Sequence, residues 1–307
     1  MKFLRRWGYI VNKKMSISNR LSENISGWLI LLPSIVLFTF YIWEPMIYSV
    51  ILSLNETKGF RMERFVGLQN YIDVLRDSVF HQALINTFFY VIWSLIIGFL
   101  VPIIIALIIN EMVHLNSFFR FSIYFPNMVP GVAALVLWGF LFDPSEGGLL
   151  NAIRIKLGFQ PSDWLQNPKL TIPLLIFIMT WKSAGSTALI YIARLQGINQ
   201  ELYEAACIDG AGIFRRIIHI TLPELYSTAR MLLIMQIIFV FQVLYEPLVL
   251  TGGGPNNASL SLMLLSYNYA FVDFVAGKSA TVSVLVTLIL MCLTFIYMKA
   301  TKENNNV

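Results

Sequence analysis

Six long stretches of apolar residues alternate with shorter polar segments along this chain. They cover residues 27–51, 84–109, 123–142, 170–192, 231–250 and 276–298. An α-helix needs about 20 apolar residues to cross a bilayer core of about 30 Å, and each stretch is about that long. Because backbone N–H and C=O groups cannot stay unpaired in lipid, we expect helices and not strands. The pattern predicts an all-α integral membrane protein with six transmembrane helices, and the length of the second stretch indicates a tilted helix.

The composition supports a membrane protein. Of the 307 residues, 57% are hydrophobic and 13% are charged, whereas a soluble domain has roughly 25% charged residues. The net charge of +5 would also suit a nucleic-acid binder. However, the basic residues crowd the N-terminus and the loops beside the apolar stretches, so we expect contact with a membrane surface and none with nucleic acid. Cys207 and Cys292 lie in a polar loop and an apolar stretch, and predict no disulfide framework.

Basic residues beside the apolar stretches predict the orientation of the chain. Lys and Arg are enriched on the cytoplasmic side of membrane proteins, and the segment before the first stretch holds six of them with Glu23 as its only acid. We therefore expect a cytoplasmic N-terminus, and six crossings return the C-terminus to the same side, where Lys299 and Lys302 agree. The first stretch is too long for the apolar part of a signal peptide, so we expect it to stay as an anchor.

Three parts follow from this topology. We expect a cytoplasmic segment over residues 1–26, a six-helix membrane domain over residues 27–298 and a cytoplasmic tail over residues 299–307. The longest cytoplasmic connection lies within the membrane domain, at about residues 193–230.

This connection is predicted to begin with a short helix. Asn199 is a suitable N-cap, and Glu201 in the first turn favours the positive end of the helix dipole. Asp209 and Gly210 then end the helix, because glycine adopts the left-handed conformation at little cost.

A second short helix is expected over residues 213–219, before Pro223 opens the fifth apolar stretch. On the first helix, Ala205 and Ala206 would let another backbone approach closely, and Glu204 offers an anion to a cationic partner. The connection therefore predicts a docking surface and not a catalytic site.

The segment EAACIDGAGIFRRIIHITLP resembles the EAA loop of ABC importer permeases. The positions that match the family are Glu204, Ala205, Ala206, Asp209, Gly210, Ala211, Ile220, Leu222 and Pro223. In that family the loop forms the coupling helix, which sits in a cleft of the ATPase subunit and converts its closure into movement of the membrane domain. The family often has a proline at the position of Asn199 and another near Ser227, and this chain departs from the family at both places. Asn199 can still start the helix.

Two further segments resemble the carbohydrate-type permeases of that family. Residues 124–151, YFPNMVPGVAALVLWGFLFDPSEGGLLN, look like their third span and the loop after it, and LTGGGP at residues 250–255 is similar to the turn after the fifth span of the subunit related to the larger maltose permease. The resemblance implies a type I ABC importer transmembrane domain in a bacterial cytoplasmic membrane. It implies that the chain moves a sugar or oligosaccharide by alternating access.

The resemblance also implies partners. They are a second homologous permease that completes a heterodimer, two ABC ATPase subunits and an extracellular solute-binding protein. No GxxxxGK[ST] phosphate loop occurs here, so we expect ATP and Mg to be bound by the ATPases and no cofactor by this chain. The absence of HExxH, GxSxG and clustered His or Cys predicts a transport subunit that has no catalytic or metal site and is not an enzyme.

Polar and aromatic side chains on the fourth and fifth stretches are candidates for the substrate path. Aromatic planes stack on sugar rings, while amides and hydroxyls bond to sugar hydroxyls. The resemblance to the larger maltose permease adds aligned positions, two of which are apolar here. The expected path consists of Trp181, Lys182, Ser183, Ser186, Gln236, Phe239, Val240, Gln242 and Val243. Helix–helix packing is the alternative role for each of them.

Lys182 is energetically unfavourable in the membrane, because insertion of a lysine at the centre of a span costs about 3 kcal/mol on insertion scales. It could neutralise an acidic sugar such as a uronate, but a Trp-Lys pair is common in the carbohydrate permeases that this chain resembles, so we favour a structural ion pair or gate. Two alternatives to the sugar importer remain: a permease for glycerol phosphate and a secondary transporter. A secondary transporter would be expected to carry intramembrane acids and broken helices, and Glu44 and Glu246 are expected at the interface beside prolines.

Overall fold

The computed structural model of the chain describes residues 17–111 and 116–304. The chain forms two compact units, Met1–Ile51 and Leu52–Val307. The basic residues before position 17 lie outside the described residues, so the cytoplasmic location of the N-terminal segment stays a prediction.

The first apolar stretch is helical throughout. It comprises α1 (Ile17–Phe38), a π-helical turn η1 (Thr39–Trp43) and α2 (Glu44–Ser53). A candidate membrane span of 27 residues, Gly27–Ser53, lies within these elements and agrees with the predicted first span.

A short β-hairpin follows α2 and was not predicted from the apolar pattern. Strands β1 (Asn55–Lys58) and β2 (Arg61–Phe65) pair antiparallel, and Arg64 Nε lies 2.6 Å from Glu56 Oε2. Gly59 adopts a φ of 61° at the turn. Both strands are polar and fall outside the spans, so they do not alter the helical character of the membrane part.

The second span is the long helix that the pattern predicted. It comprises α4 (Ser78–Trp93), a π-helical segment η2 (Ser94–Phe99) and α5 (Leu100–Glu111), and is 34 residues long. Before it lies the short helix α3 (Gln69–Arg76). At 1.5 Å per residue, 34 residues measure roughly 50 Å, which exceeds the bilayer core and agrees with a tilted helix.

The third span is broken, and the prediction of one continuous helix over residues 123–142 was wrong. Helix α6 (Asn116–Met128) and helix α7 (Gly131–Leu141) meet at 94°. Pro130 lies between them; proline has no backbone N–H and disfavours the helical conformation of the residue before it. The described residues therefore contain five candidate spans, or six if this bent pair is one span.

The fourth span is α9 (Thr171–Leu195), which contributes residues to two hydrophobic clusters of the second unit. It follows α8 (Leu149–Lys156) and a short 3₁₀ turn η3 (Trp164–Gln166). Leu175 and Ile176 on α9 pack in one cluster with Tyr90 of α4 and Phe241 of α12 (Leu222–Phe241). A second cluster places α9 against α5 around the fully buried Tyr191.

The fifth span differs from its prediction at both ends. The helix expected over residues 213–219 begins at Ile213 as predicted, but it is not separate, because helical residues continue without a break into the span. The elements in order are α10 (Gln200–Ile208), α11 (Ile213–Arg216), π-helical η4 (Ile217–Thr221) and α12. Pro223 is tolerated in the first turn of α12, where its missing N–H costs little. The helix also stops at Phe241 and resumes as α13 (Tyr245–Leu250).

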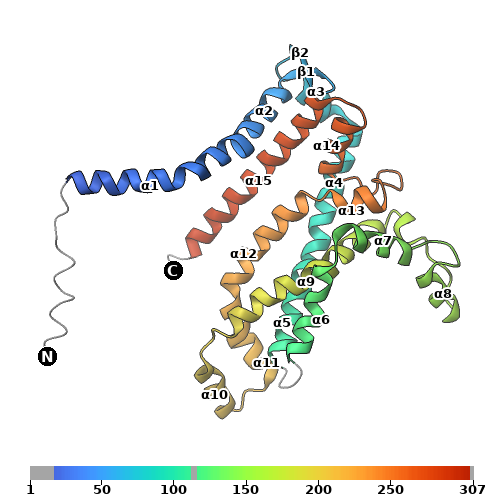
Figure 1. Ribbon diagram of the computed structural model, residues 1–307. Coiled ribbons are helices and arrows are strands. Elements are labelled where there is room, and N and C mark those ends of the chain that lie inside the picture. The colour runs from blue at the N-terminus through green and yellow to red at the C-terminus, as the bar shows by residue number, and fades with distance from the viewer. Residues whose placement is uncertain (1–16, 112–115, 305–307) are drawn as a thin grey trace. The chain divides into compact units, whose positions relative to one another are not determined.

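The last span is α15 (Ala276–Asn304), which continues into the segment where we expected the C-terminal tail. It packs against α14 (Leu262–Phe271), and the two helices lie side by side in the second unit (Figure 1). Ser266 Oγ of α14 lies 3.0 Å from the hydroxyls of both Ser279 and Ser283 on α15. Such small polar residues allow helices to pack closely in lipid, where the hydrophobic effect does not drive helix association.

Candidate functional site

Helix α10 has the local structure that the sequence predicted. Asn199 caps its start, with its side chain accepting a hydrogen bond from the Glu201 N–H at 3.0 Å. Gly210 ends it with a φ of 75°. The N–H of Gly210 bonds to Cys207 O at 3.0 Å and the N–H of Ala211 to Ala206 O at 2.8 Å, which is the glycine-dependent helix end expected here.

The surface of this connection is open and partly apolar. Ile208 and Phe214 are 86% and 80% exposed, on either side of Gly210. The expected coupling residues Glu204, Ala205, Asp209, Gly210, Leu222 and Pro223 are also exposed, and Ala206 and Ala211 are half-buried. Sequence reasoning missed Ile208 and Phe214 as surface residues; two large apolar residues in an otherwise polar loop were the available signal.

Three contacts hold the ends of the connection to the spans. Arg194 Nη2 lies 2.9 Å from Glu224 Oε2, Tyr203 Oη lies 3.0 Å from Thr221 Oγ1, and Arg216 Nη1 donates to Cys207 Sγ at 3.3 Å. The first contact joins α9 to α12, and the other two join α10 to η4 and α11, while most side chains of α10 stay exposed.

The expected substrate path divides between cavities and packed helix faces. Lys182 lines a cavity of about 340 Å³ together with Gly131 of α7 and with Tyr245 and Glu246 of α13. The neighbouring cavity, of about 590 Å³, shares Tyr245 and Glu246 and is lined by three further path residues, which are Phe239, Gln242 and Val243. These four path residues therefore lie around adjoining spaces.

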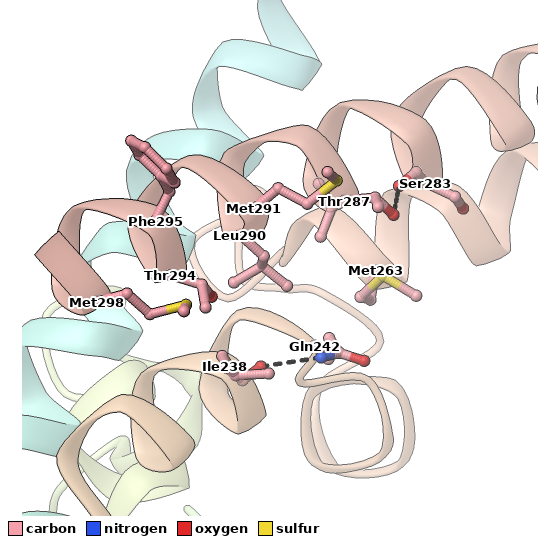
Figure 2. Close-up of a pocket in the computed structure, with 11 residues that line it drawn as sticks. Ile238, Gln242, Met263, Ser283, Thr287, Leu290, Met291, Thr294, Phe295 and Met298 are labelled. Atoms are coloured by element: carbon pink, nitrogen blue, oxygen red, sulfur yellow. Dashed lines mark hydrogen bonds between the residues drawn. The ribbon is translucent and has the colours of Figure 1, made fainter. Parts of the chain in front are cut away.

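Gln242 also lines a third space, between α12, α14 and α15 (Figure 2). Its volume is about 600 Å³, and most of the lining side chains are apolar, among them Met263 and Phe295. The Gln242 amide donates to Ile238 O at 3.1 Å. Its donor is thus partly used by its own helix.

Other expected path residues have partners within the helix bundle. Ser183 Oγ donates to Met179 O at 2.9 Å, and Ser186 Oγ donates to Ser183 O at 2.8 Å. Asn127 Nδ2 of α6 lies 3.3 Å from Ser186 Oγ. These contacts are those of helix packing, and a role in the path stays a prediction.

Three more path residues are packed among helices. Val240 is fully buried in the core. Gln236 lies against the π-helical segment of the second span, where a Cβ on Gly98 would lie 2.7 Å from Gln236 Nε2. Trp181 packs edge-on against Trp138 with ring centroids 5.4 Å apart, and lines a separate space of about 320 Å³.

Glu246 lines the cavity of Lys182, which was not predicted from the sequence. It was expected at the interface, at the outer end of an unbroken fifth span. Glu246 follows the interruption of the helix between Phe241 and Tyr245 and lines the cavity that Lys182 lines from the middle of α9, while its position at the membrane interface stays a prediction. Pro247, directly after it, was the available signal of a break.

The LTGGGP turn is held by the second span. Gly252 and Gly253 adopt φ values of 58° and 88°. Asn86 Nδ2 donates to Asn257 O at 2.7 Å and Leu260 O at 3.0 Å. The compact loop expected from three glycines and a proline is confirmed, and its position depends on buried polar groups of α4.

Replacement of Asn86 by Leu tests this attachment. The change leaves the carbonyls of Asn257 and Leu260 without their donor, and an unsatisfied buried acceptor costs about 1–3 kcal/mol. We expect a lower unfolding temperature in detergent and faster proteolysis within residues 251–261. Gln82→Leu is the control, because Gln82 is exposed and its amide donates to Asn86 Oδ1. If Gln82→Leu had the same effect as Asn86→Leu, the hydrogen bonds of Asn86 would not be what attaches the turn to α4.

The loop after α7 is also ordered by hydrogen bonds. Asp143 Oδ1 accepts from the Ser145 N–H at 2.8 Å, which holds the pKa of this carboxyl below its usual range. The fully buried Asn151 donates to Pro144 O at 2.9 Å and accepts from Trp164 Nε1 at 2.8 Å. Among the described residues there is no group of His, Cys, Asp and Glu that could hold a metal ion.

The five or six candidate spans among the described residues indicate a multi-pass membrane protein. The chain belongs to the family described as the binding-protein-dependent transport system inner membrane component, whose model matches residues 98–301. The predicted fold class and family are thereby confirmed.

Named relatives cover nearly the whole chain. The probable ABC transporter permease protein YurN of Bacillus subtilis is 32% identical over 90% of this chain and 96% of its own length. The trehalose/maltose transport system permease protein MalF of Thermococcus litoralis is 33% identical over 89% and 92%. The crystal structure of a bacterial ABC transporter involved in the import of the acidic polysaccharide alginate matches with a TM-score of 0.82 at 25% identity, over 92% of this chain and 99% of that chain.

Proposed function

We propose that this chain is the permease subunit of an ATP-driven, binding-protein-dependent importer of a sugar or oligosaccharide. The family match over residues 98–301 is the observation that supports a role in transport. The saccharide is supported by the names of the relatives, which include a trehalose/maltose permease and an alginate importer. Glycerol phosphate, the alternative kept from the sequence analysis, is the second candidate.

Helix α10 is proposed as the docking site of the ATPase. Its exposed acid Glu204 suits a cationic partner, and the exposed Ile208 and Phe214 offer apolar area that a cleft would remove from water. ATP and Mg would be bound by two copies of that ATPase, because this sequence has no phosphate loop. The permease role of the relatives supports this division.

The remaining partners follow from the same proposal. A second homologous permease would complete the translocation path, and an extracellular solute-binding protein would deliver the cargo. Both termini and α10 would lie in the cytoplasm of a bacterial cell, with the LTGGGP turn outside. Broken helices and an acid at a cavity are also features of secondary transporters, but the family assignment favours the importer.

Uptake measurements test this function. Cells that lack the chain should lose ATP-dependent uptake of a labelled saccharide from a panel of maltose-, arabinose- and glucose-based oligosaccharides, and should regain it with the gene. Loss of glycerol phosphate uptake alone would support the second candidate. Unchanged uptake of every member of the panel, together with glycerol phosphate, would contradict the proposal.

Cysteine labelling tests the orientation with a native probe. Cys207 lies exposed on α10, so after Cys292→Ser it is the single native thiol. We expect a membrane-impermeant maleimide to label added Asp163→Cys in spheroplasts, and to label Cys207 only after the membrane is opened. Labelling of Cys207 from outside, with Asp163→Cys protected, would invert the topology.

A further inference from the structure

Two broken helices meet at the cavity that Lys182 lines. Helix α7 begins at Gly131, directly after the break of the third span, and α13 begins at Tyr245, after the break of the fifth. The continuous helix α9 supplies Lys182 as the third wall. Irregular backbone at membrane depth is tolerated where it lines a cavity or is buried in protein, and broken helices often mark transport sites.

The cavity has one cationic and one anionic wall. The Lys182 ammonium lies beside Gly131, where a Cβ would be 3.1 Å from Nζ, so glycine leaves room for it at the helix break. Glu246 lines the same space. The two direct ion pairs among the described residues involve neither side chain. Lys182 and Glu246 therefore line one cavity without a direct ion pair between them.

The rest of the lining suits a neutral sugar. Apart from these two charges, the cavity is lined by apolar side chains such as Val132 and Met179 and by the largely exposed Tyr245. Sugar rings have apolar faces that pack on such surfaces, and their hydroxyls can donate to a carboxylate and accept from an ammonium. An anionic sugar in this cavity would lie near the carboxyl group of Glu246, whose negative charge would repel it and offset the attraction of Lys182.

We propose that Lys182 and Glu246 are each other's counter-ions across this cavity, and that the pair makes the cavity accept neutral saccharides in preference to acidic ones. The proposal rests on the function proposed above and names its substrate class. It assigns Lys182 a partner within the chain, in place of a negatively charged cargo.

A double-mutant cycle tests the pair without any cargo. Lys182→Met and Glu246→Gln each leave one unpaired charge in the membrane, whereas the double variant leaves none. We expect each single change to lower the unfolding temperature of the purified, assembled transporter, and the double variant to recover most of the loss. Lys278→Met with Glu44→Gln is the control cycle, because neither residue lines this cavity, and its effects should add. Additive losses at Lys182 and Glu246 would overturn the pair.

Uptake tests the selectivity. Cells with the wild-type chain are given labelled malto-, cello- and arabino-oligosaccharides and labelled oligogalacturonides. We expect uptake of a neutral sugar, a fall of about tenfold in each single variant and recovery in the double variant. Uptake of oligogalacturonides that Lys182→Met abolishes and Glu246→Gln spares would make Lys182 the counter-ion of an acidic cargo and overturn the proposal. If no saccharide of either kind enters, the proposed function fails, while the unfolding cycle still decides whether the pair exists.

Discussion

We expect Phe214→Ala and Glu204→Lys each to abolish ATP-dependent uptake while the chain stays folded in the membrane. Phe214 is 80% exposed, so its truncation removes little packing within this chain. At a docking surface, however, loss of a central aromatic residue costs about 2 kcal/mol or more, which is roughly a thirtyfold loss of affinity. Reversal of the charge at Glu204 adds repulsion against a cationic partner. The measurements are co-purification of the ATPase and substrate-stimulated ATP hydrolysis.

The control for this prediction is Phe65→Ala. Phe65 is 72% exposed, similar to Phe214, but lies on the β-hairpin, whereas Phe214 lies on α11, next to α10 in the chain. It should leave both ATPase binding and the unfolding temperature near the wild-type values. If Phe214→Ala and Glu204→Lys retain normal coupled ATP hydrolysis, α10 is not the site where the ATPase docks.

We expect Gly185→Ala to destabilise the chain, although alanine is the better helix former. A Cβ at this position would collide with the backbone carbonyl of Ile123 and lie 3.0 Å from Tyr124 Cα, so α6 has to move away from α9. Overpacking of this kind costs about 1–3 kcal/mol, and backbone, unlike a flexible side chain, cannot turn aside. We expect a lower unfolding temperature in detergent and reduced uptake.

Gly27→Ala is the matched change for comparison. Gly27 is also in a helix, but a Cβ there would meet no atom within 4 Å. Alanine is favoured over glycine in a helix by about 1 kcal/mol, so this variant should be neutral or slightly stabilised. A Gly185→Ala variant as stable as Gly27→Ala would show that α6 and α9 do not pack as described.

The local structure of the coupling connection was predictable because it depends on neighbours in the chain. An Asn side chain reaches an N–H two residues away, and glycine at position 210 tolerates a positive φ that other residues avoid. The second helix was not predictable in the same way. Pro223 suggested a new start, but the π-helical segment η4 keeps the helix continuous into α12.

The candidate path shows where residue type alone misleads. A polar side chain on an apolar span can face a cavity or another helix, and only its surroundings decide between them. Lys182 and Gln242 line cavities, whereas Gln236 lies against Gly98 and the hydroxyl of Ser183 bonds to its own helix. The buried Val240 gave no signal for either role.

The sequence by itself determined the number and order of the apolar stretches, the family, and the caps of α10, because each depends on composition or on contacts within one helical turn. Only the tertiary structure decided that the third span bends by 94°, that the helix of the fifth span is interrupted between Phe241 and Tyr245, and that Glu246 lines the same cavity as Lys182, 64 residues earlier in the chain. A proline signals that a helix can break, but the direction of the chain after the break depends on packing against other helices. The charges that share a cavity are therefore set by contacts far apart in sequence, which no local pattern contains.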